Sequence, residues 1–209
     1  AVPNYYYYNT TSELGIIPPA EHSTVASNLG SGVHKLMGII GLYSKSEPYS
    51  ISLKDYLEHG CIRIQIEAAV AGCMFLEEQG FVVMDKDKLV TDNRSGLPLF
   101  IDLVIKEKES NQLYALEIKT VWKASSEQLN TANDYARTHR EQALLAASQF
   151  SNNRYGAATL HLVIPYEKNV DYIAASMMLF SPNQVEKVKQ IVNDETPIDL
   201  IDSQFLAEQ

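Results

Sequence analysis

Two apolar segments in the middle of the chain each carry one carboxylate, and the second also carries a lysine. Asp102 interrupts the segment Phe100–Ile105, and Glu117 and Lys119 interrupt the segment Tyr114–Thr120. Because residues i and i+2 of a β-strand point to the same face, Glu117 and Lys119 should share one side of a sheet. If the two segments form a hairpin, Asp102 lies beside Glu117, and two carboxylates so close repel each other unless a cation lies between them.

Oxygen ligands of this kind suit Mg²⁺ or Mn²⁺, the cations that phosphodiester-cleaving sites use to polarise a phosphate and acidify a water. Carboxylates also occur on the wet face of a half-exposed sheet, which is the usual explanation for an isolated Glu-x-Lys. Here Leu, Ile, Val and Phe flank both carboxylates, as in strands buried on both faces, where charges are rarely placed without a partner or a metal. The pattern therefore favours a metal site that cleaves phosphodiesters.

On these residues the chain resembles the PD-(D/E)XK nuclease superfamily, including its RecB-like and viral or phage-type members. In that superfamily a strand Asp and a Glu-x-Lys on the next strand bind metal and activate water. The resemblance covers about residues 55–165 and is carried by Asp102, Glu117 and Lys119. It implies Mg²⁺ or Mn²⁺ as cofactor and the backbone carbonyl of Ile118 as a further metal ligand. The chain lacks the Pro that often precedes the strand Asp.

The resemblance also implies a carboxylate on the helix before the sheet, and Glu67 occupies that place. The i−4 neighbour of Glu67 is Arg63, so an ion pair on the wet face of the helix is the competing interpretation. His34 is the other candidate ligand, because some RecB-like members carry a His on an early helix. We rank Glu67 first, since its helix leads directly into the sheet, whereas His34 stands far upstream of Asp102.

Candidate substrate-binding residues follow the Glu-x-Lys strand. A long helix is predicted over residues 125–150, and Gln142 matches a Gln that RecB-type nucleases carry in this helix to arrange the site. Arg140 and Lys123 are weaker candidates for holding a phosphate, as is His139. A solvated polar turn of an amphipathic helix explains His139 and Arg140 equally well.

The elements that must position these residues are predicted from apolar spacing and turn signals. They are a short helix at 33–42, a helix from about residue 52 to Gly80, a strand at 81–84, a polar excursion at 85–94, the Asp102 strand, a hairpin loop at 106–112, the Glu117 strand, the long helix, a strand at 158–165 and a helix beginning at Ser181. This order predicts one α/β domain over residues 1–209, with a restriction-endonuclease-like core in which helices flank a mixed central β-sheet.

Both ends of the chain are predicted to be additions to this core. The N-terminal arm, residues 1–31, contains Tyr5–Tyr8, which can stack on bases, form a strand, pack on the body or contact another subunit. At the other end, residues 181–209 begin with a helix that has Ser181 as its N-cap and Pro182 at its first position. The acidic tail that follows either caps its own core or crosses to a partner subunit, so a homo-oligomer is an open alternative.

Composition sets outer limits on the function. A chain of 209 residues forms one well-buried domain and is short for two. The net charge of −9 argues against a protein that coats nucleic acid through bulk electrostatics, although a metal site itself requires carboxylates. Two cysteines, Cys61 and Cys73, are too few for a four-cysteine zinc or iron–sulfur site. No apolar run of about 18 residues and no signal-peptide pattern is present, which predicts no membrane partner and a cytoplasmic protein, host-intracellular if virus-encoded.

We therefore expect a Mg²⁺- or Mn²⁺-dependent deoxyribonuclease that hydrolyses DNA phosphodiester bonds. The two strand carboxylates, with Glu67 and the Ile118 carbonyl, hold the metal, while Lys119 orients the attacking water and stabilises charge at the phosphate. One alternative is a member of the same fold that binds DNA or protein without cleaving it, which the acidic balance suits. The other is an RNA endonuclease of the viral cap-snatching type, which relies on a His ligand such as His34 or His59.

Overall fold

The structure is a computed structural model that describes residues 5–9, 22–43, 63–91, 96, 98–123, 139–140, 142–149, 154–165 and 172–193. In chain order its elements are β1 (Tyr6–Asn9), α1 (His22–Tyr43), α3 (Arg63–Glu78), β2 (Phe81–Thr91), β3 (Pro98–Glu107), β4 (Leu113–Lys123), β5 (Tyr155–Pro165), β6 (Tyr172–Phe180) and α5 (Pro182–Asn193). A further helical stretch at 139–140 and 142–148 lies between β4 and β5 in the chain.

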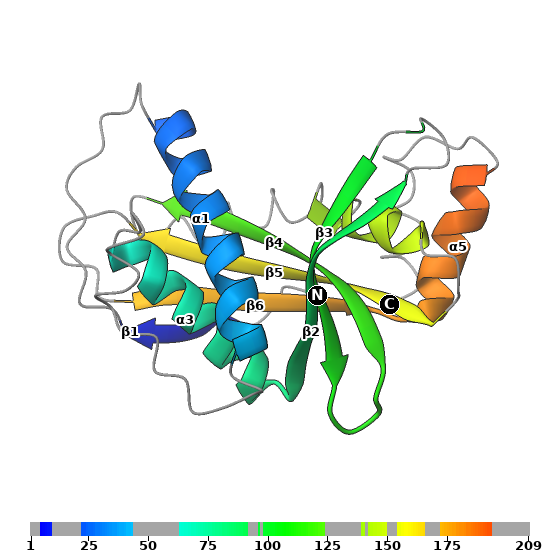
Figure 1. The fold of residues 1–209 in the computed structure, drawn as a ribbon, viewed down its shortest axis with the longest axis horizontal. Helices are drawn as coiled ribbons and strands as arrows, with labels where there is room; N and C mark the ends of the chain where they lie inside the picture. The colour runs from blue at the N-terminus through cyan, green and yellow to red at the C-terminus, as the bar shows by residue number, and fades with distance from the viewer. Residues whose placement is uncertain are drawn as a thin grey trace.

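The strands form one sheet in the order β1-β6-β5-β4-β3-β2 (Figure 1). Strands β2, β3 and β4 are an antiparallel meander, as predicted, and β5–β6 and β6–β1 are also antiparallel. Strands β4 and β5 are parallel, a pairing that requires a crossover connection, and the helical stretch 139–148 belongs to that connection. The fold is thus mixed α/β with a mixed sheet, which agrees with the predicted class.

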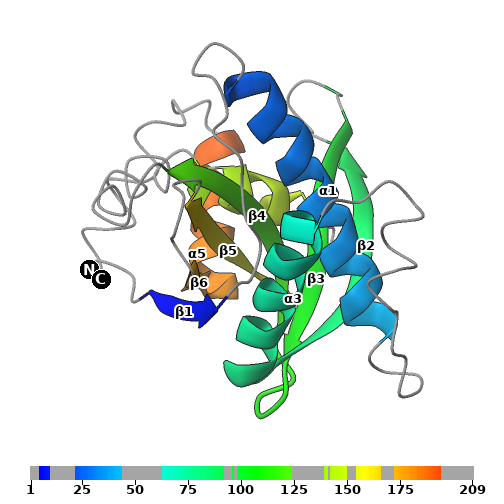
Figure 2. The ribbon, with the colours of Figure 1, turned by 90° about the vertical axis from the view of Figure 1, so that its left-hand side faces the viewer.

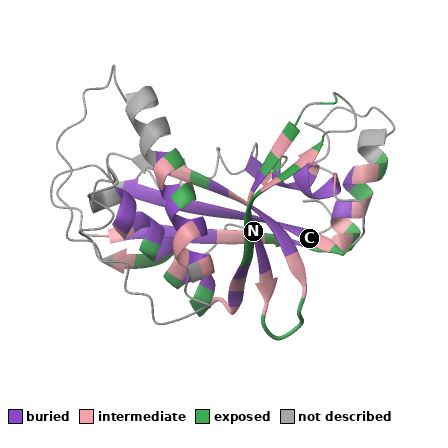
Figure 3. Ribbon diagram, in the orientation of Figure 1, coloured by how far each residue is buried: buried purple, intermediate pink, exposed green. Residues whose placement is uncertain are grey.

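Helices cover both faces of the sheet (Figures 1 and 2). On the first face, the side of α1 and α3, Met37 and Phe75 pack with Leu116 of β4. On the second face, Leu144 of the helical stretch and Val188 of α5 belong to a separate core that also contains Ala115 of β4. Neighbouring residues of β4 therefore enter different cores, as expected of a strand buried on both sides (Figure 3). Polar residues on such a strand stand out as exceptions.

The polar excursion predicted at 85–94 is wrong, because β2 continues as a strand to Thr91. Its charged residues pair with β3 through Lys86↔Leu103 and Lys88↔Ile101. Strand preference depends strongly on context, so the available partner outweighs the polar composition. A bulge between Val83 and Asp85 adjusts the register, and the charged side chains suit the exposed edge of a sheet.

Two helices differ in length from the predictions. The helix predicted at 33–42 begins at His22 in the structure. Its first half escaped prediction because it is rich in Ser, Asn and Gly and shows no apolar periodicity. The helix before the sheet, predicted to end at Gly80, ends at Glu78, two residues earlier; Gly80, with a φ of 86°, has the left-handed conformation common just after a helix. Its predicted start near residue 52, together with His59 and Cys61, lies outside the described residues, as does the predicted helix over 125–138.

At the ends of the chain, one alternative for the tyrosines is confirmed. Tyr6–Asn9 form β1, which pairs with β6, a strand that the sequence reasoning missed. The helix at Ser181 is also confirmed, because Ser181 Oγ accepts a hydrogen bond from the Gln184 N–H at 3.2 Å and Gln184 Oε1 accepts one from the Ser181 N–H at 2.7 Å. This reciprocal pair is a capping box. The acidic tail from residue 194 lies outside the described residues.

No helix in the described ranges is both long and apolar enough to cross a membrane.

A carboxylate pair where strands β3 and β4 separate

The hairpin between β3 and β4 is confirmed and brings the two predicted carboxylates together. Its turn is closed by a 2.9 Å hydrogen bond from the Glu107 N–H to the Gln112 carbonyl. The register pairs Leu103 with Leu116, so the next position along each strand is Asp102 on one side and Glu117 on the other. A short turn with in-register strands is sufficient to place these side chains next to each other.

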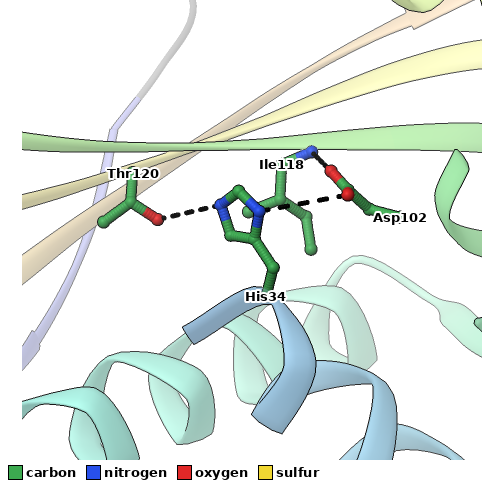
Figure 4. A network of polar contacts seen from close by, with 4 residues as sticks. All are labelled: His34, Asp102, Ile118 and Thr120. Carbon is green, nitrogen blue, oxygen red and sulfur yellow. Dashed lines mark hydrogen bonds and ion pairs between the residues drawn. The ribbon is translucent and has the colours of Figure 1, made fainter. Parts of the chain in front are cut away.

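The backbone pairing of β3 with β4 ends at Leu103, and beyond it the two strands diverge (Figure 1). Asp102 lies at this separation point. Its Oδ2 accepts a 2.7 Å hydrogen bond from the backbone N–H of Ile118 (Figure 4). The carboxylate thereby satisfies a strand N–H where the backbone ladder has stopped, which fixes its position relative to β4.

Glu117 is a buried carboxyl whose pKa is strongly raised. Burial, the neighbouring charge of Asp102 and a hydrogen bond with the Asp102 side chain together raise its pKa to about 9, and burial is the largest of these causes. Both side chains are only partly accessible. Two carboxyl groups that close cannot both ionise easily, so in the absence of a cation the pair shares one proton at neutral pH.

His34 reaches the same point from α1 on the first face (Figure 4). Its Nδ1 lies 3.9 Å from Oδ1 of Asp102, and its Nε2 lies 3.2 Å from Oγ1 of Thr120. Burial lowers the pKa of His34, and the charge of Lys119 lowers it further, although Asp102 acts in the opposite direction. The ring is therefore a neutral imidazole at neutral pH, with a lone pair available for a metal or a hydrogen bond.

Of the two candidate helix ligands, His34 is the one with a described contact to Asp102. Helix α1, which carries His34, packs over β2, β3 and β4, whereas α3, which carries Glu67, packs mainly on α1, β2, β5 and β6. Glu67 is half-buried in α3. Metal ligation by Glu67 stays a prediction, but the contacts described at Asp102 come from Glu117, Ile118 and His34.

Lys119 and Glu117 project to the second face, because they alternate with Leu116 and Ile118 of the first-face core. Lys119 is exposed, and its partner in the parallel register of β5 is His161. His161 in turn meets His139, whose Nδ1 lies 2.9 Å from His161 Nε2. The sequence reasoning left His161 unassigned and treated His139 as a weak phosphate contact.

The remaining substrate-binding candidates are Arg140, Gln142 and Lys123. Arg140 is half-buried, and its Nη1 lies 3.7 Å from Sδ of Met178, while Gln142 is exposed. The backbone of Lys123 belongs to β4, but its side chain lies outside the described structure. Binding of a phosphate by any of these three residues stays a prediction.

The donor set fits a hard divalent cation. In the described part of the chain, no three or more His, Cys, Asp and Glu side chains form a ready-made metal cage. Mg²⁺ seldom requires one, since it is usually held by one or two carboxylates and completed by waters and substrate phosphates. Asp102 and Glu117 are such a pair, and a cation bound between them would displace the proton that the raised pKa of Glu117 implies.

No family model and no curated protein matches the chain. The chemistry of the site must therefore be judged from its geometry. A carboxylate pair and a neutral imidazole meet where two strands separate, and an exposed lysine follows two residues after Glu117 on the same strand. Such a set can hold a divalent cation, bind a phosphate and move a proton.

Proposed function

We propose that this protein is a metal-dependent nuclease of the PD-(D/E)XK type, built on a restriction-endonuclease-like core. The observation that carries the proposal is the Asp102–Glu117 pair, whose closeness and burial keep one carboxyl protonated unless a cation replaces the proton. Lys119, two residues beyond Glu117, supplies the third member of the motif on the same face of β4. DNA is the proposed substrate.

In this proposal Asp102, Glu117 and the Ile118 carbonyl hold Mg²⁺ or Mn²⁺. When bound, the ion would polarise the scissile phosphate and acidify a water. Asp102 is held for this task by the Ile118 N–H, so its position does not depend on the ion. Preorganisation of this kind favours catalysis, because no rearrangement is needed as charge develops.

Lys119 orients the attacking water and stabilises the negative charge that grows on the phosphate. Its exposure leaves the ammonium accessible to a polymeric substrate. His34 is neutral, and its Nδ1 lies 3.9 Å from Oδ1 of Asp102, so its side chain offers a nitrogen close to the pair. Imidazole is a softer ligand than carboxylate, so participation of His34 would favour Mn²⁺ over Mg²⁺.

The same histidine favours a second candidate function. The resemblance to viral cap-snatching RNA endonucleases includes a His ligand beside the carboxylates, and the 3.9 Å approach of His34 to Asp102 fits that pattern. RNA is therefore the alternative substrate. Cytoplasmic location and homo-oligomer formation stay predictions on either reading.

Both candidates are tested by one cleavage assay. Linear, circular and single-stranded DNA and a matched RNA would be incubated with Mg²⁺, Mn²⁺ or EDTA. We expect Mn²⁺-supported cleavage that EDTA abolishes and that Asp102→Asn lowers at least about 10²-fold, the scale expected for disruption of preorganised charge stabilisation. Asn keeps an oxygen for the Ile118 N–H, so the fold should survive.

The matched control is Asp85→Asn, which changes an exposed carboxylate on β2. It should leave cleavage unchanged. Equal activity of Asp102→Asn and the wild type would disprove the site, and a folded protein that cleaves neither DNA nor RNA would be the binding protein considered above. Preference for RNA over DNA would establish the second candidate instead of the first.

A further inference from the structure

Behind Lys119 lies a buried histidine pair that the proposed chemistry does not use. His139 and His161 are each 4% exposed. Nδ1 of His139 lies 2.9 Å from Nε2 of His161, and the ring centroids are 4.9 Å apart with the planes tilted by 41°. The pair joins the helical stretch 139–148 to β5 through a single hydrogen bond between ring nitrogens.

One atom of the pair has no partner. Nε2 of His139 is fully buried, and within the described part of the chain it makes no hydrogen bond. Buried polar atoms are almost always paired, because desolvation without a hydrogen bond is unfavourable. A buried nitrogen without a hydrogen bond, close to a candidate active site, indicates either that its hydrogen-bond partner binds in another state of the protein or that the fold is strained there.

Both rings are uncharged at neutral pH. Burial, together with the charges of His161, Lys119 and His34, lowers the pKa of His139 to about 2. Burial, together with the charges of Arg140 and Lys119, lowers the pKa of His161 to about 4. A neutral imidazole has one N–H and one lone pair. If His139 donates its Nδ1–H to His161, the buried Nε2 of His139 carries the lone pair and requires a hydrogen-bond donor.

Lys119 is the donor that the fold supplies. It is the register neighbour of His161 in the parallel pairing of β4 and β5, and the two residues share the second face. Its charge also contributes to lowering the pKa of both imidazoles. The lysine side chain is exposed and carries three N–H donors on a flexible stem, so it can turn toward His139.

We propose that His139 and His161 are positioning residues for Lys119, with the Lys119 ammonium donating a hydrogen bond to Nε2 of His139 while Nδ1–H of His139 donates to His161. The proposal rests on the role of Lys119 in the proposed phosphodiester cleavage. The contact restricts a long, mobile side chain to one direction and leaves two ammonium protons for the water and the phosphate. Fixing a catalytic group in this way lowers the entropic part of the barrier.

The kinetic test compares His139→Leu with His139→Asn. Leucine removes the acceptor and keeps much of the volume, whereas asparagine can still accept a hydrogen bond. His139→Leu should lower kcat by about 10-fold or more with KM nearly unchanged, which is below the loss of about 10²-fold expected for Lys119→Ala. His139→Asn should recover part of the rate. Combining His139→Leu with Lys119→Ala should be no worse than Lys119→Ala alone.

The matched control is Ser148→Ala, which changes another buried polar residue of the same helical stretch, one whose Oγ donates to the Leu145 carbonyl instead. It should retain wild-type kcat. A His139→Leu enzyme with wild-type kcat, including one in which only KM changes, would overturn the proposal. So would a double variant whose losses multiply, because independent residues act additively in free energy.

A measurement without substrate separates this inference from the nuclease proposal and does not require the leucine variant to fold. In ¹⁵N NMR of the full chain, His139 should have a protonated Nδ1 and an unprotonated Nε2. Lys119→Met should shift the Nε2 resonance, whereas Lys108→Met, in the exposed β3–β4 turn, should not. A protonated Nε2, or no shift with Lys119→Met, would refute the contact. If the contact is seen but no substrate is cleaved, the nuclease proposal fails and the lysine–histidine geometry stands.

Discussion

Binding of Mn²⁺ to the carboxylate pair should release about one proton per ion at pH 7. With its pKa raised to about 9, Glu117 is protonated in nearly every metal-free molecule at pH 7, two units lower. A carboxyl must lose its proton to ligate a metal. Each pKa unit is worth about 1.4 kcal/mol, so the proton opposes metal binding by about 3 kcal/mol at pH 7, and by about half of that at pH 8.

Titration calorimetry in two buffers of different ionisation enthalpy measures the protons released directly. The affinity for Mn²⁺ should rise by about tenfold per pH unit between pH 6 and pH 8, because the metal competes with one proton. Glu117→Gln should abolish the proton release and weaken binding. Asp102→Asn should also weaken binding and reduce the release, since the neighbouring charge that helps to hold the proton on Glu117 has been removed.

The same reasoning fixes the sign of a stability effect. The folded pKa of Glu117 lies above its ordinary value of 4.5, so the metal-free protein loses stability as the pH rises from that value toward 9. Mn²⁺ should therefore raise Tm more at pH 8 than at pH 6. Tight Mn²⁺ binding with no proton release and no pH dependence would show that Glu117 is already ionised in the free protein, and equal binding by Asp102→Ala and the wild type would show that the metal binds elsewhere.

Four other substitutions test three separate parts of the structure. Lys119→Ala should leave Mn²⁺ binding and Tm intact yet lower single-turnover cleavage by at least about 10²-fold, and an active variant would mean that the lysine is only structural. His34→Ala should reduce Mn²⁺-dependent cleavage more than Glu67→Gln, because His34 is the residue beside Asp102; the opposite order in a paired assay of folded variants would return the ligand role to Glu67. Ser181→Ala should destabilise the protein by about 1 kcal/mol in urea unfolding, the usual cost of a lost N-cap, and no change would mean that the capping box at α5 contributes nothing.

The parts of the site that are local in sequence could be predicted, and the parts that depend on distant packing could not. Asp102 and Glu117 belong to strands joined by a short turn, so alternation and a hairpin suffice to bring them together. Lys119 follows from the same alternation. The position of His34 depends on how α1 crosses β3 and β4, and a lone histidine in a Gly-rich helix gives no signal of that path.

The histidine pair illustrates the same limit. His139 and His161 meet only because β5 returns parallel to β4 after the crossover, which places His161 beside Lys119 and the helical stretch above it. Neither residue has an informative neighbour in the sequence. Two parts of the sheet also escaped prediction. The second half of β2 extends through charged residues, and β6 is a short apolar run that periodicity alone does not separate from a helix.

The hydrogen bond from the Ile118 N–H gives Asp102 a role in folding in addition to its proposed role in catalysis, and this affects how the same aspartate in a related sequence should be interpreted. A carboxylate that completes the sheet would be retained by selection for folding even in a descendant that had lost catalysis, because its removal leaves a strand N–H without a partner. Lys119 is exposed, and an ammonium cannot accept a hydrogen bond from a strand N–H, so its loss leaves no backbone donor without a partner. If the proposed nuclease function holds, a related sequence that keeps the aspartate but has lost the lysine would therefore be a pseudoenzyme, whereas retention of the aspartate alone would say nothing about activity.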